Sequence, residues 1–155
     1  MTRPHGLLRA GYPYSHTLGM RRVTNFPADI AFSGKGDAYI LLRPSDGNAS
    51  IRIWPVDDMD FFTDDLKTIG GYGTEDGQFI WPVQIITDSR GCIFVSDEAT
   101  HRISQFDPDG NFLSKWGTEG DATGQFNSPA GIAFTPDGNL MIVDSKNHRI
   151  QNFQN

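Results

Sequence analysis

The chain repeats itself, and this repeat restricts the possible folds more than any other feature. Residues 82–106 align with residues 129–153 without a gap, at a spacing of 47 residues. Both copies open with a proline, place a glycine nine residues later, and then carry an Asp and a His-Arg-Ile run. A weaker copy with the same opening proline and glycine occupies residues 26–70. Such a period predicts one structural unit that is used three times.

Each copy has the pattern of several short strands separated by tight turns. A proline-opened apolar segment leads through a glycine turn to a second apolar segment, and a polar turn leads to a third segment around Arg-Ile. The copies predict an all-β fold, a β-propeller with four-stranded blades at 26–70, 82–117 and 129–155. The third copy lacks an outer strand, and residues 1–11 are expected to form an N-terminal tail.

Residues 12–19 resemble the last strand of the second copy, at 112–117, although they precede the first blade. We expect this segment to close a ring by completing the third blade, which leaves no open sheet edge. Propellers have about 4–8 blades, so three blades cannot close alone. The sequence therefore predicts a strand-exchanged homodimer with six blades, and the alternative is that the chain is part of a longer propeller.

The last copy resembles the NHL repeat, through GQFxxPxGIA at 124–133, DGNLMIVD at 137–144 and NHRIQxF at 147–153. The resemblance is good over 77–117 and loose over 26–70. It implies a six-bladed propeller. The family includes modules that bind proteins or RNA, and it is similar to the peptidyl-hydroxyglycine amidating lyases. Those lyases bind metal through His residues just after the blade-opening proline, where this chain has Ala28, Val83 and Ala130.

Two sets of turns are expected on one face of a propeller, around the mouth of its channel. They are the turns that lead into the first strand of each blade and those between the second and third strands. Loop residues on such a face are the usual place for ligand contacts. The ligand-binding candidates are Asp29, Arg43, Trp81, Gln84, Glu98, Ser145 and Lys146. The candidate acid–base residues are Glu98, His101 and His148, and both histidines also suit a turn-packing role.

Three further features leave alternatives open. Asp29 of two copies would face one axis and could bind a divalent cation, calcium or zinc, or only form hydrogen bonds. Asp97 with Arg102, and Asp144 with Arg149, stand five residues apart and are expected to hold their own turns. The first blade has Leu42 in place of this Asp, which indicates either ligand contact or drift.

The charge and the hydropathy of the chain disfavour two classes of partner, nucleic acids and membranes. The chain has 13 Lys and Arg against 19 Asp and Glu, a net charge of −6, which disfavours nucleic acid. We find no apolar run long enough for a membrane span or a secretory signal, and expect a cytoplasmic protein. The favoured function is a binding or scaffold module for a protein or small-molecule ligand. The alternative is a metal-dependent lyase or hydrolase, lactonase-like or amidating-lyase-like, at the channel.

Overall fold

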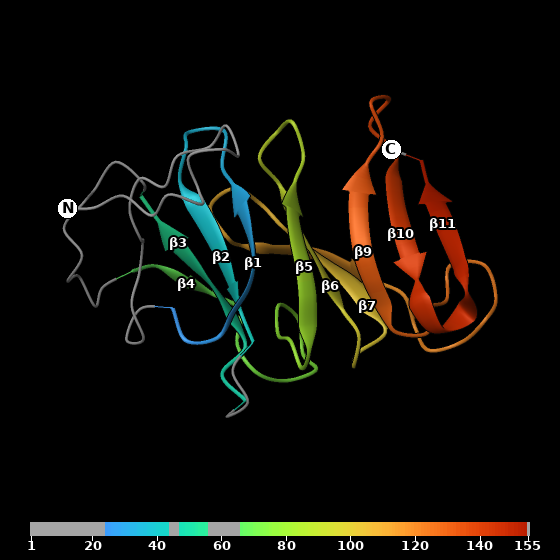
Figure 1. Cartoon of the computed structure of the whole chain (residues 1–155). Helices are drawn as coiled ribbons and strands as arrows, with labels where there is room; N and C mark the ends of the chain where they lie inside the picture. Colours follow the sequence, from blue (N-terminus) through green and yellow to red (C-terminus); the bar gives the residue numbers. More distant parts are fainter. Residues whose placement is uncertain (1–23, 44–46, 56–65, 155) are drawn as a thin grey trace, which may run out of the picture.

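The computed structural model of the chain describes residues 24–43, 47–55 and 66–154, and these form three antiparallel sheets (Figure 1). The strands of the first sheet, blade 1, are β1 (Pro27–Phe32), β2 (Ala38–Leu42), β3 (Ser50–Trp54) and β4 (Thr68–Ile69). Blade 2 contains β5 (Pro82–Thr87), β6 (Ile93–Asp97), β7 (Arg102–Phe106) and β8 (Phe112–Trp116). Blade 3 contains β9 (Pro129–Phe134), β10 (Leu140–Asp144) and β11 (Arg149–Phe153).

The predicted all-β class is confirmed, and one 3-10 turn at Ser145–Asn147 interrupts it. The strand order within each blade follows the chain. The predicted tail at 1–11 and the predicted closing strand at 12–19 lie outside the described residues. No helix among the described residues is long and apolar enough to cross a membrane.

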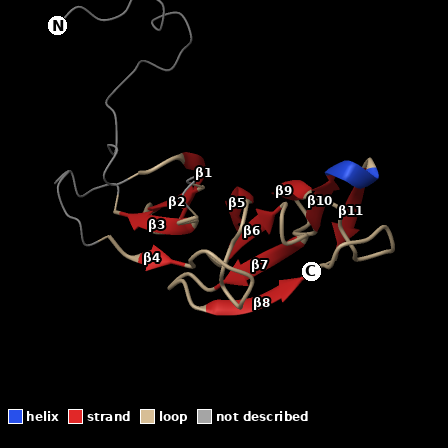
Figure 2. Ribbon diagram, turned by 90° about the horizontal axis from the view of Figure 1, so that it is seen from below, coloured by secondary structure: helices blue, strands red, loops and turns tan. Residues whose placement is uncertain are grey.

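The three blades stand side by side, and their first strands β1, β5 and β9 lie along one edge of the assembly (Figure 2). Apolar side chains fill the space between successive sheets. Blades 1 and 2 enclose one cluster that includes Leu41, Ile51 and Val95, and blades 2 and 3 enclose a second that includes Ile132 and Ile142. Burial of these faces against one another is the main contribution to the stacking of the blades.

The loop that precedes each of the last two blades sends a phenylalanine back into the core. The rings of Phe79 and Phe106 are 5.8 Å apart at 50°, and those of Phe126 and Phe153 are 5.8 Å apart at 47°. A Cβ atom on Gly117 would come within 2.5 Å of the Phe126 ring, and Gly117 has φ of +100°. Glycine is therefore required where the chain leaves β8.

Candidate ligand-binding face

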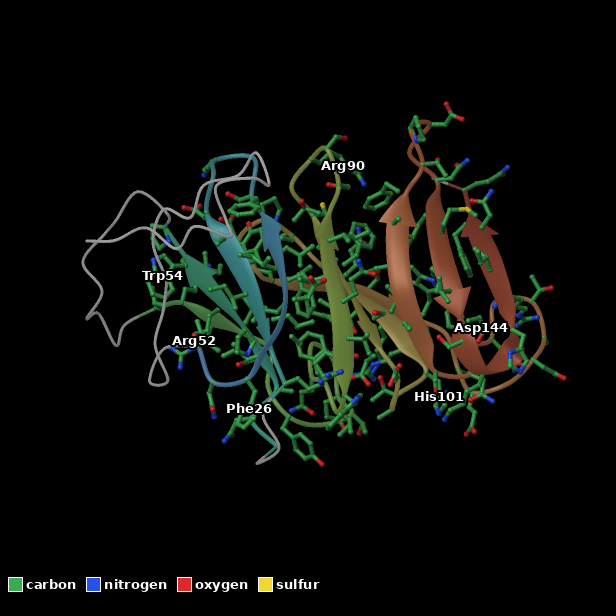
Figure 3. The ribbon with its side chains drawn as sticks, viewed as in Figure 1. Phe26, Arg52, Trp54, Arg90, His101 and Asp144 are labelled. Carbon is green, nitrogen blue, oxygen red and sulfur yellow. The ribbon has the colours of Figure 1, made fainter. Side chains whose placement is uncertain are left out.

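The turns that were expected on one face do lie at one end of the sheets. Figure 3 shows Phe26, His101 and Asp144 at this lower end and Arg90 at the opposite end. In each blade a backbone amide of the turn between the second and third strands donates to a carbonyl that lies one or two residues before the opening proline. The pairs are Arg43 to Phe26 at 3.0 Å, Glu98 to Trp81 at 3.1 Å and Lys146 to Asn127 at 3.0 Å. By strand register Arg43 and Glu98 are matched positions, and their counterpart in blade 3 is Ser145, next to Lys146.

In blade 2 both the Asp and the Arg of the repeat bind backbone groups of the connection from blade 1, and the Asp also binds its own turn. The buried Asp97 carboxylate accepts hydrogen bonds from the amides of Ile80 and Trp81, at 2.7 and 3.1 Å, and also from two amides of its own turn. The Arg102 guanidinium donates to the carbonyls of Thr74, Glu75 and Gln78, at 2.6, 3.0 and 2.7 Å. The prediction that Asp97 holds its own turn is confirmed, whereas Arg102 holds the loop that precedes blade 2 and not its own turn.

In blade 3 the same two residues also form an ion pair. Arg149 Nε lies 2.8 Å from Asp144 Oδ2, and the guanidinium donates to three carbonyls of the preceding loop. Burial raises the pKa of Asp144. Hydrogen bonds from Asn127, Asn147, Arg149 and Gln151 outweigh burial, so the pKa is below its ordinary value. Asp144 is therefore ionised and structural.

Blade 1 lacks this arrangement, and exposed aromatic side chains lie before its first strand and in its connection to blade 2. Phe26, Tyr72 and Trp81 are 62%, 55% and 43% exposed. The Arg43 guanidinium lies 4.6 Å from the centroid of the Trp81 ring, which is a cation–π contact. Gly47, in the turn that follows Arg43, lies against the ring of Tyr72. We refer to Phe26, Arg43, Tyr72 and Trp81 as the aromatic patch.

The inner strands are joined by side chains that had been ligand candidates. Asp29 Oδ2 accepts a hydrogen bond from the Ile85 amide at 2.9 Å, and Gln84 Oε1 accepts one from the Ile132 amide at 2.5 Å. Gly131 occupies the equivalent position of blade 3 and has no side chain to offer. Asp29 and Gln84 thus connect successive blades, and one Asp29 oxygen has a backbone partner. Among the described residues, no three His, Cys, Asp or Glu side chains gather into a metal site.

The remaining candidates lie in the second turns, and the structure does not join them into one constellation. His101 Nδ1 accepts a hydrogen bond from the Ser128 amide at 3.1 Å, so it connects blade 2 to blade 3. Within the described residues, the side chains of Glu98, Ser145, Lys146 and His148 form no hydrogen bond or ion pair. His101 and His148 share a left-handed backbone, with φ of 53° and 54°.

Sequence reasoning missed two residues at this end, Tyr72 and Arg52. Tyr72 occupies the bridge position that Glu119 has in the next loop, so a comparison of the two loops contained the signal. Arg52 lies in β3, two positions beyond Ser50, which aligns with Arg102 and Arg149. Because the first copy of the repeat matches the others only weakly, the sequence alone does not show that its arginine has shifted by two positions.

Comparison with known proteins identifies the repeat and the fold. Residues 126–153 match the family model described as the NHL repeat. The protein lin-41 of Caenorhabditis elegans is 44% identical over 50 residues, 32% of this chain and 4% of that relative. The RING finger protein nhl-1 of the same organism is 38% identical over 51 residues, 33% of this chain and 5% of that relative. The chain thus spans a small part of the curated relatives it matches.

A solved structure supports the fold over most of the chain. Virginiamycin B lyase from Staphylococcus aureus is 18% identical, with a TM-score of 0.60, and the match covers 89% of this chain and 41% of that one. At this identity the likeness concerns the fold alone. The three sheets are those of a β-propeller. Residues 126–153 are an NHL repeat within it, which confirms the family resemblance seen in the sequence.

Proposed function

We propose that the chain is a non-catalytic binding propeller whose ligand contacts the aromatic patch. The observation that carries the proposal is the Arg43 guanidinium stacked on the exposed Trp81 ring, with Phe26 and Tyr72 exposed at the same end. Trp, Tyr and Arg are the residues that contribute most to protein–protein binding when a partner covers them. Exposed clusters of large apolar side chains are otherwise unfavourable in a soluble protein.

A protein segment suits this surface better than a buried small molecule does. The aromatic patch is open, and its side chains come from three separate segments, around Phe26, Arg43 and residues 72–81. A surface of this kind favours a partner that lays side chains across several loops. The positions that correspond to Arg43 in the other blades are Glu98 and Ser145, and among the described residues neither takes part in a cation–π contact. The binding surface is therefore assigned to blade 1 and its junction with blade 2.

A random peptide library displayed on phage tests this proposal. The wild-type chain should enrich a defined set of peptides, and Trp81→Ala should lose them because it removes the ring on which Arg43 stacks. Arg90→Ala is the matched control, since Arg90 is exposed at the opposite end and, among the described residues, its side chain pairs with Asp88 alone. No enrichment on the wild type, or equal enrichment on Trp81→Ala, would contradict a ligand surface at the patch.

The ring in this proposal is completed by a second copy of the chain, giving six blades. Phe26 and Ser128 both precede an opening proline and share a left-handed φ, of 52° and 56°. The Ser128 amide donates to His101 of the preceding blade. Blade 1 has Leu42 where the other blades have an Asp, so no carboxylate is available to the Phe26 amide. No described residue accepts a hydrogen bond from that amide. His148 of a second copy would supply that acceptor if its blade 3 preceded blade 1.

The outer face of blade 3 supports the same arrangement. Val143 and Ile150 are 39% and 62% exposed, whereas their counterparts in blade 2, Ser96 and Ile103, are buried against blade 3. Light scattering should give the mass of two chains for the wild type and of one chain for Ile150→Asp. A mass of one chain for the wild type at every concentration would contradict the two-chain ring.

The alternative is a metal-dependent lyase or hydrolase that acts at the central channel and binds a cation through Asp29. In a two-chain ring the second Asp29 carboxylate would face the same axis, and calcium or zinc would bridge the pair. Elemental analysis after dialysis against calcium or zinc chloride separates the two proposals. One ion per two chains that is lost in Asp29→Asn would favour the alternative, and a metal-free protein would favour the binding module.

A further inference from the structure

Arg52 has an unusual place among the arginines of the three blades. In the sheet it lies opposite Ile40 and Thr68, and its counterparts by register are Ser104 in blade 2 and Gln151 in blade 3. Its side chain points to the side of blade 1 that faces away from blade 2, as does that of Trp54 (Figure 3). Arg52 therefore belongs to no contact between the described blades, and in the proposed two-chain ring it lies at the junction with blade 3 of the second copy.

No described residue pairs with the Arg52 side chain. Its Nε atom is buried without an acceptor, as is that of Arg102, and its other guanidinium nitrogens form no hydrogen bond or ion pair with a described residue. In contrast, Arg102 and Arg149 each donate to three backbone carbonyls. A guanidinium that is partly withdrawn from water without acceptors is unfavourable, because its lost hydration is not replaced. An arginine in this condition is suited to an acceptor that arrives from outside.

The surroundings of Arg52 form a pocket with the character of an anion site. The hollow has a volume of about 470 Å³, and its polar lining includes Asn25, Ser50, Arg52, Thr68 and Tyr72. None of the described residues that line it is Asp or Glu. The Ser50 and Thr68 hydroxyls donate only long hydrogen bonds, of 3.4 and 3.3 Å, to carbonyls of neighbouring residues. These hydroxyls can rotate toward a ligand, and the volume is that of an ordinary ligand pocket.

We infer that this pocket binds a carboxylate, the Asp or Glu side chain of the peptide segment that covers the aromatic patch. Tyr72 belongs both to the patch and to the pocket, and Leu42 in the pocket wall directly precedes Arg43. The planar guanidinium matches a carboxylate with two parallel hydrogen bonds. This inference rests on the proposed function and specifies it: the partner segment carries an acidic residue beside the residue that contacts Trp81.

The test is an acetate titration followed by NMR of the arginine Nε–Hε groups in the ¹⁵N-labelled full chain. The Arg52 signal should shift and saturate with acetate, and should not do so with chloride at the same ionic strength. The signal of Arg149 is the internal control and should stay in place, since its Nε already donates to Asp144 Oδ2 at 2.8 Å. Arg52→Gln identifies the signal by its loss, and a urea unfolding curve like that of the wild type shows that this variant folds.

The outcomes separate this inference from the proposed function. In Trp81→Ala the Arg52 signal should still respond to acetate as in the wild type, because the pocket does not include Trp81. A saturating response together with failure of the peptide selection would support the carboxylate pocket and contradict the patch. No saturable response to acetate, or a response at least tenfold tighter to inorganic phosphate, would overturn the inference.

Discussion

Blades 2 and 3 differ from blade 1 at the same end of the molecule. In blades 2 and 3 a buried Asp accepts a backbone amide of the entry turn, and an Arg donates to three carbonyls of the preceding loop. In blade 1, Leu42 replaces the Asp, the arginine lies two positions later in its strand, and its guanidinium donates to no described residue. The Asp and Arg that recur in blades 2 and 3 therefore hold the loops. We propose that blade 1, which lacks both at these positions, binds the ligand.

The largest expected change in the free energy of unfolding comes from substitution of Arg102, the arginine of the repeat in blade 2. Arg102→Gln removes three charge-assisted hydrogen bonds from a nearly buried side chain, and should lower the free energy of unfolding by about 3 kcal/mol. The matched variant Arg52→Gln breaks no described contact and should change it by less than about 0.5 kcal/mol. Urea unfolding of both proteins checks the pair, and equal losses would remove the distinction between the blades.

A smaller effect, with a pH signature, is expected at the buried carboxylate of blade 3. Asp144→Asn should cost about 2 kcal/mol at pH 7, since it removes the negative charge opposite Arg149. The pKa of Asp144 is lower in the folded protein than its ordinary value of 3.8, so its ionised form stabilises the fold above that pH. This stabilisation falls as the pH drops below 3.8 and ends below the lowered folded pKa.

The free energy of unfolding, measured at several pH values, tests this assignment. The difference between the wild type and Asp144→Asn should narrow as the solution is acidified, because protonation of Asp144 removes the same charge as the substitution. A difference that stays constant from pH 7 to about pH 2 would show that the carboxylate charge has no part in holding the turn.

The smallest effect concerns the two matched histidines. His101→Ala removes the acceptor of the Ser128 amide and should lower the free energy of unfolding by about 1 kcal/mol. His148→Ala removes no described contact and should be neutral wherever light scattering finds single chains. In the two-chain ring it should instead weaken association of the chains. Neutral behaviour of both variants would contradict the role of His101 between blades.

The repeat made most of the fold readable from the sequence, because equal spacing of Pro, Gly, Asp and Arg imposes the same turns on each copy. The roles of Asp97 and Arg149 followed from that regularity. The partner of Asp29 did not, since its hydrogen bond to the Ile85 amide joins two blades and depends on how they stack. Arg52 was equally hidden. Arg52 differs from Arg102 because no described carbonyl accepts from its guanidinium, which only the three-dimensional arrangement shows.

Binding of one peptide from the library selection, measured on matched variants, tests the assignment of the ligand to blade 1 most directly. Arg43→Ala combined with Arg52→Gln alters blade 1, and Glu98→Ala combined with Lys146→Ala alters the matched turns of the other two blades. We predict an increase of Kd of at least about tenfold for the first pair and less than about twofold for the second. Equal losses for both pairs, or a loss only for the second, would contradict the account.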